Sequence, residues 1–88
     1  MANKDFSIEI FTPKKRIFSG SAVSVIAPGA LGYLGILHNH APLMTTLVPG
    51  NLIVRNDSGE TTIFKSQGEG FLEVFHNKVT VLAEKIAE

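Results

Sequence analysis

Two histidines, His38 and His40, form the pair in this sequence whose type and spacing most favour metal binding. On a strand, side chains at positions i and i+2 point to the same face, so the two imidazoles could share one ion. Zinc sites usually take three or four protein ligands, and the third histidine, His76, lies in a polar turn with no metal motif around it. The two are therefore interpreted as loop histidines, one of them hydrogen-bonded to a partner or to backbone, and no metal or cofactor is predicted.

Together with Gly32, which precedes them, the two histidines resemble the opening of the cupin metal motif. That motif requires a glutamate shortly after the histidines, and Met44 and Thr45 occupy the positions concerned. A small cupin-like metal-binding β-domain that uses His38 and His40 is kept as the alternative hypothesis. Metal analysis of protein purified without an affinity tag would distinguish it.

The glycines at 29, 32 and 35 do not have the setting of a phosphate-binding loop. Such loops open a helix, and nucleotide sites add a Lys with Ser or Thr, whereas these glycines lie between apolar residues that lead into a strand. They are expected to form turns, a bulge or a close backbone approach. No serine lies in a G-x-S-x-G elbow, and the carboxylates are typical of solvated turns and strands. No catalytic residue is predicted.

Alternating apolar and polar residues predict that short β-strands position these segments. Strands are expected at 6–10, 17–18, 22–27, 31–37, 43–48, 51–55, 61–66, 71–75 and 79–83. Turn-forming residues separate them at 12–15, 19–21, 28–29, 49–50, 56–59, 68–70 and 76–78. Residues 83–88 are good helix formers and favour the start of a helix. The spacing of strands and turns is typical of an all-β sandwich or barrel.

The composition limits the classes of partner. The chain has 88 residues, no cysteine, 44% hydrophobic residues, and eight basic residues that balance eight acidic ones. Nucleic acid is therefore not expected as a partner, and no apolar run approaches the roughly 20 residues that span a bilayer. Six phenylalanines are expected mostly to fill the core. Ile17, Phe18 and residues 31–33 are apolar on both strand faces, which indicates a surface that meets a partner.

A series of short motifs carries a family resemblance. These are Phe-Ser-Gly at 18–20, Pro-Gly at 28–29, Leu-Gly-Ile-Leu at 34–37, His-Ala-Pro-Leu at 40–43, Pro-Gly at 49–50, Gly-Phe-Leu-Glu-Val at 70–74 and Val-Thr-Val-Leu-Ala at 79–83. In this order and spacing the chain resembles the N-terminal β-sandwich domain of the epsilon subunit of F-type ATP synthase, called delta in mitochondria. The most specific signal is Leu-Gly-Ile followed by His-Ala-Pro.

The resemblance implies one domain over residues 1–88, a two-sheet β-sandwich of about ten short, mainly antiparallel strands. It implies a non-catalytic rotor subunit of the central stalk that couples the proton- or sodium-driven c-ring to the gamma subunit and to ATP synthesis. The implied partners are gamma, the c-ring and, indirectly, the F1 alpha/beta subcomplex. The implied location is peripheral, on the cytoplasmic face of the bacterial inner membrane, and the isolated chain is expected to be a monomer without direct membrane insertion.

Family positions assign two sets of contact residues. The gamma-facing set is Thr12, His40, Ala41, Pro42 and Thr45, and the set that faces the c-ring is Ala30, Leu31, Gly32 and Tyr33. Many bacterial relatives carry an acidic residue in place of Tyr33 and proline in place of His38. An acid could pair with a basic c-ring loop, so the resemblance implies an apolar or hydrogen-bonded contact at Tyr33 here.

Family members usually continue into a two-helix hairpin that inhibits ATP hydrolysis, and this sequence ends before it. The ending is compatible with a naturally short form and with a truncated one. If the short form is natural, both the inhibition and the ATP site that some relatives build on those helices are expected to be absent. Adding the chain to the catalytic subcomplex should then leave ATP hydrolysis largely uninhibited.

Overall fold

The computed structural model describes residues 4–87 of the chain. Alternation of apolar and polar residues gives eight strands in this part of the molecule. They are β1 (Phe6–Phe11), β2 (Arg16–Ala22), β3 (Ser24–Gly29), β4 (Gly32–Ile36), β5 (Leu43–Leu47), β6 (Gly50–Arg55), β7 (Thr61–Phe75) and β8 (Lys78–Ala87). Within residues 4–87 no helix is long and apolar enough to cross a membrane.

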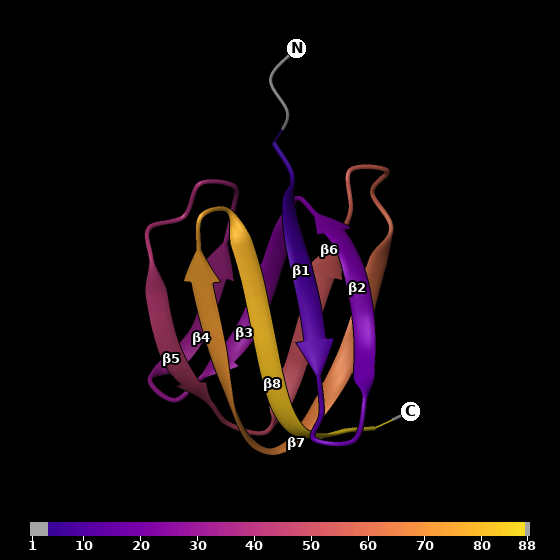
Figure 1. Cartoon of the computed structure of the whole chain (residues 1–88), viewed down its shortest axis with the longest axis vertical. Helices are drawn as coiled ribbons and strands as arrows, with labels where there is room; N and C mark the ends of the chain where they lie inside the picture. Colours follow the sequence, from indigo (N-terminus) through magenta and orange to yellow (C-terminus); the bar gives the residue numbers. More distant parts are fainter. Residues whose placement is uncertain (1–3, 88) are drawn as a thin grey trace.

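The strands form two layers joined by the two long strands β7 and β8. In one layer β2, β1, β8, β7 and β5 are neighbours, and in the other β4, β3, β6 and the first half of β7 are neighbours. Figure 1 shows β1, β2 and β8 in front of β3 and β6. The pairing is antiparallel except between β1 and β8, which run parallel with Ile8 opposite Val79. A two-sheet, mainly antiparallel β-sandwich is therefore confirmed.

The core lies between the layers and consists mostly of aliphatic side chains. In β1, in β6, in the second half of β7 and in β8 up to Ala83, every second residue is buried, as the period of two requires. The completely buried members are Ile8, Ile10, Ala22, Val25, Ala27, Leu52, Leu72, Val81 and Ala83. Of the six phenylalanines only Phe6 is fully buried, and Phe71 and Phe75 are 54% and 52% exposed. Phe18 and Phe64 pack against the core from partly buried positions, so the prediction that phenylalanines mostly fill the core holds only in part.

Three predicted boundaries are corrected. The described residues form eight strands and not about ten, because residues 68–70 do not end a strand: β7 continues through them with a register shift between Gln67 and Gly70. Residues 19–21 lie inside β2 and pair with β1, so they are not a turn. Residues 84–87 extend β8 and do not start a helix, because 85–87 pair with 65–67 of β7. Glu88 lies outside the described residues.

Candidate functional site

The loops gather at two opposite ends of the sandwich, and the predicted contact residues lie on both. The upper end, as drawn in Figure 1, is where β1 begins; it carries the β4–β5 loop (37–42) and the turns at 56–60 and 76–77. The lower end carries the turns at 12–15, 30–31 and 48–49. Strand direction fixes this distribution, since each antiparallel pair returns the chain to the end it came from.

The β4–β5 loop holds three of the five residues predicted to face gamma: His40, Ala41 and Pro42. Its backbone is fixed by a bond from the His40 N–H to the Leu37 carbonyl (3.3 Å) and by a left-handed Asn39 with φ of 59°. The His40 Nδ1 lies 2.7 Å from the Ala41 carbonyl oxygen. Ala41 and Pro42 are exposed, so the loop presents apolar side chains at its surface. Thr45 continues this surface as a half-buried residue of β5.

Asn77 anchors this loop from the β7–β8 turn. Its Oδ1 accepts a hydrogen bond from the Asn39 N–H (2.6 Å), and its Nδ2 donates to the Asp5 carbonyl (3.0 Å). It also has a positive φ of 59°, a conformation that asparagine tolerates better than most residues. Sequence reasoning assigned this residue only to a turn. A turn asparagine next to a contact loop was the available signal.

Replacing Asn77 with alanine is expected to lower the free energy of unfolding by about 2 kcal/mol, since two hydrogen bonds are lost and alanine is strained at this φ. Amide exchange at Asn39 should also accelerate. Asn77→Gly is the matched control, because it removes the same bonds but relieves the backbone, so it should cost only about 1 kcal/mol. Urea unfolding followed by circular dichroism measures both. An Asn77→Ala protein as stable as wild type would contradict this role.

The residues predicted to face the c-ring occupy the tip of the β3–β4 hairpin at the lower end. Ala30 and Leu31 form the turn, and the Leu31 side chain is fully exposed. The Ala30 N–H donates to the Thr46 carbonyl (3.0 Å), which ties the tip to β5. Gly32 has a φ of 127°, which a side chain would oppose. The structure thus brings Ala30, Leu31, Gly32 and Tyr33 together on one projecting hairpin.

Thr12 lies away from the other gamma-facing residues. It follows the end of β1 at the lower end, where its N–H donates to the Lys15 carbonyl (2.9 Å). The next residue, Pro13, lines a groove of about 410 Å³ together with Ala30 of the hairpin tip. The predicted gamma set is therefore split: His40, Ala41 and Pro42 lie at the upper end, Thr45 lies in β5, and Thr12 is at the end that carries the hairpin.

The histidine pair has no further ligands in the described part of the chain. Among residues 4–87 no group of three or more His, Cys, Asp or Glu side chains is placed to hold a metal ion. His38 and His40 lie in the β4–β5 loop and not on a strand, so the i, i+2 argument for a shared face does not apply to them. No observation favours the metal-binding alternative.

An exposed apolar surface on β5, β7 and β8 was not predicted. Thr46 of β5, Phe71 of β7 and Leu82 of β8 are cross-strand neighbours in one row. Met44 lies on the same face of β5, two residues before Thr46. Met44, Phe71 and Leu82 are 69%, 54% and 45% exposed. The signal was present in the sequence, because Phe71 and Phe75 alternate with Leu72 and Val74, which are buried. By contrast, Ile17 and Phe18, which were expected to meet a partner, pack against the core.

Three known proteins that are similar to this chain in sequence are ATP synthase epsilon chains. The chain is 48% identical over 79 residues to the ATP synthase epsilon chain of Chromohalobacter salexigens, an alignment that covers 90% of this chain and 55% of the relative. It is 41% identical over 81 residues to that of Desulfosudis oleivorans, covering 92% and 60%. The alignment with the Caulobacter vibrioides epsilon chain has 44% identity over 88 residues and covers 100% of this chain and 98% of that one. The chain spans 55–60% of the length of the first two relatives.

Two solved structures share the fold. A chain in the Euglena gracilis mitochondrial ATP synthase superposes with a TM-score of 0.84 at 18% identity, covering 91% of this chain and 51% of that chain. A chain in the central stalk/c-ring structure of the Tetrahymena thermophila enzyme superposes with 0.78 at 18%, covering 93% and 65%. The family described as ATP synthase, Delta/Epsilon chain, beta-sandwich domain matches residues 5–88. Because that match spans the whole described sandwich, the chain belongs to this family of ATP synthase delta/epsilon beta-sandwich domains.

Proposed function

We propose that the chain works as the epsilon subunit in the central stalk of an F-type ATP synthase, where it couples the c-ring to the gamma subunit without catalysing a reaction itself. The alignment with the Caulobacter epsilon chain carries this proposal, because it spans both proteins almost completely at 44% identity. The Tetrahymena chain of similar fold belongs to a central stalk/c-ring assembly, which is the setting proposed for this chain.

A rotor subunit of this kind needs two separate surfaces on one stiff body. The β4–β5 loop with Thr45 supplies one surface and the β3–β4 hairpin supplies the other, at opposite ends of strands that share a core. Close packing gives such a core low compressibility, so a load applied at one end is transmitted to the other. We assign His40, Ala41, Pro42 and Thr45 to gamma and residues 30–33 to the c-ring. We assign Thr12 to gamma as well, which requires gamma to extend along the sandwich to the lower end.

The remaining parts of the proposal concern the setting of the subunit. It lies peripherally on the cytoplasmic side of the bacterial inner membrane, with its hairpin end toward the ring. It touches the alpha/beta subcomplex only through gamma. Free in solution it is a monomer, which light scattering of the isolated chain tests; a dimer would contradict this part.

Gamma binding tests the proposal directly. Ala41→Asp places an unpaired carboxylate on the exposed loop, and it is expected to weaken the complex with purified gamma at least about ten-fold, because a charge buried in an interface without a partner is costly. Ser58→Asp is the control, since Ser58 is exposed in the β6–β7 turn at the same end but outside the proposed surface. Isothermal titration gives both dissociation constants. Failure of the wild-type chain to bind gamma would refute the proposed function, and equal weakening by both variants would refute the assigned surface.

A further inference from the structure

The Tyr33 side chain reaches from β4 across β3 to β6, where its hydroxyl accepts a backbone hydrogen bond beyond the end of the β3–β6 pairing. Strand β6 pairs with β3 from Ile53 to Arg55, and the same register continued would place Asn51 opposite Pro28. Pro28 has no N–H, and its carbonyl already accepts a bond from the Val48 N–H (2.9 Å). The Asn51 N–H donates to the Tyr33 hydroxyl at 3.3 Å. A side chain of β4 thus takes up a backbone donor of β6 at the point where the β3–β6 ladder stops.

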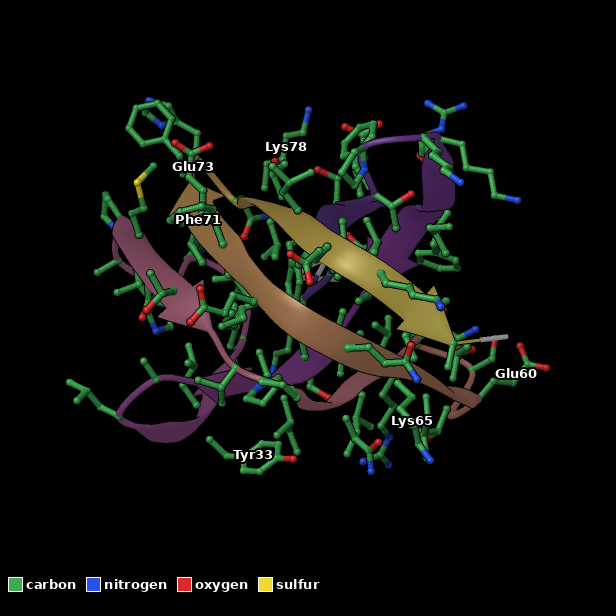
Figure 2. All side chains as sticks on the ribbon, turned by 90° about the horizontal axis from the view of Figure 1, so that it is seen from below. Tyr33, Glu60, Lys65, Phe71, Glu73 and Lys78 are labelled. Atoms are coloured by element: carbon green, nitrogen blue, oxygen red, sulfur yellow. The ribbon has the colours of Figure 1, made fainter. Side chains whose placement is uncertain are left out.

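The contacts around Gly50 show how closely these groups meet. A Cβ added to Gly50 would lie 2.8 Å from the Pro28 Cβ and 2.8 Å from the Tyr33 Oη. Tyr33 is the cross-strand partner of Pro28, and Pro28 is fully buried although Tyr33 itself is 61% exposed. The Tyr33 ring therefore reaches from β4 past Pro28 to the start of β6. Figure 2 shows Tyr33 projecting on the side of the molecule opposite to Glu73 and Lys78.

The hydrogen bond between Tyr33 and Asn51, called the clamp below, lies directly beside the tip of the β3–β4 hairpin. Among the described strands, β4 has β3 as its one neighbour, so the hairpin has few other anchors. The Ala30–Thr46 bond holds one side of the turn and the Tyr33–Asn51 bond holds the other. Leu31 lies between these two anchors with its side chain fully exposed. Residues 17–54, which include the whole hairpin, contain no Asp, Glu, Lys or Arg.

We propose that Tyr33 is a positioning residue: its hydroxyl, bonded to the Asn51 N–H, holds the tip of the β3–β4 hairpin against β6 and thereby orients Leu31, which the proposed function assigns to the c-ring contact. The partner in this inference rests on the proposed function, whereas the clamp rests on the geometry of this chain. Because the hairpin is uncharged, the contact does not depend on salt, unlike one made by an exposed ion pair.

The clamp is tested in the isolated chain with Tyr33→Phe, which keeps the ring over Pro28 and removes the hydroxyl. Amide exchange measured by NMR should be about five-fold faster at Asn51, the effect of losing one hydrogen bond, and unchanged at Val25 in the core. The melting temperature should stay close to that of wild type, because the core is untouched. An unchanged exchange rate at Asn51 would overturn the positioning role, whatever the protein binds.

The contact is tested in the assembled complex with photo-leucine at position 31. Crosslinks to the c subunit are expected, with a yield at least about two-fold lower in the Tyr33→Phe background and constant between about 50 mM and about 500 mM salt. Photo-leucine at position 37 is the control, because Leu37 is exposed in the β4–β5 loop at the opposite end of the sandwich. A yield that falls with salt, or crosslinks from position 31 to another subunit, would overturn the apolar contact. A chain that does not assemble with the stalk would refute the proposed function, and the Asn51 result would still decide the clamp.

Discussion

Replacing Leu72 with alanine is expected to lower the free energy of unfolding by about 3 kcal/mol, within the range of buried leucine truncations. Leu72 is completely buried in the middle of the second half of β7. It pairs with Thr45 of β5 on one side and with Val81 of β8 on the other, so a cavity there opens between three strands that cannot close independently. Urea unfolding followed by circular dichroism gives the difference.

Leu82→Ala is the matched control for this prediction. Leu82 lies on the neighbouring strand, but its side chain faces outward and is 45% exposed. The same truncation there should cost less than about 1 kcal/mol, because only part of the side chain leaves a buried environment. Equal losses in the two variants would show that the inner and outer faces of this layer are not as described.

The alternation of apolar residues was sufficient to predict several strands and their buried faces. In β1 the predicted inward residues Phe6, Ile8 and Ile10 are 3%, 0% and 0% exposed. In β8 the alternating residues Val79, Val81 and Ala83 are buried in the same way. These predictions succeeded because the period of two is a local property: burial of one residue on a strand fixes the side of its neighbours.

Strand continuity could not be predicted, because it depends on partners distant in sequence. Glycines at 68 and 70 around Glu69 have the composition of a turn, yet β7 passes through them with only a shift in register. What keeps the strand going is β8, whose Lys85 pairs with Gln67 and whose Ala83 pairs with Gly70. Local sequence cannot separate a bulge from a turn, since both favour glycine and differ only in what lies beside them.

The same limit applies to the contact residues. The motifs placed residues 30–33 and 40–42 in two groups, and each group lies together on one loop or hairpin. Thr12 was grouped with His40, but the two lie at opposite ends, because the ends of strands are known only once their directions are. The hydrogen bond from the Asn51 N–H to the Tyr33 hydroxyl could not be predicted either, because it depends on the register of β4, β3 and β6.

Replacing Gly70 with alanine is expected to destabilise the protein by about 3 kcal/mol and to lower its melting temperature by roughly 15 °C. Gly70 is buried between Leu47 of β5 and Ala83 of β8. A Cβ there would overlap the Leu82 carbonyl oxygen and lie 3.1 Å from the Ala83 Cα. Both obstacles are backbone atoms, so relief requires the β7–β8 ladder to separate where β7 passes from one layer to the other.

Gly35→Ala is the matched control, and the comparison separates close packing from the general effect of a glycine substitution. Gly35 also lies in a strand, and its φ is not in the left-handed region. Apart from Gly35 itself and its two chain neighbours, no described residue has an atom within 4 Å of an added Cβ. Alanine there should leave stability unchanged or raise it by about 0.5 kcal/mol, because it restricts the unfolded chain. Differential scanning calorimetry measures both variants. If the Gly70→Ala and Gly35→Ala proteins had the same melting temperature, the close approach of β7 and β8 would be wrong. The account of how β7 joins both layers of the sandwich would then be wrong as well.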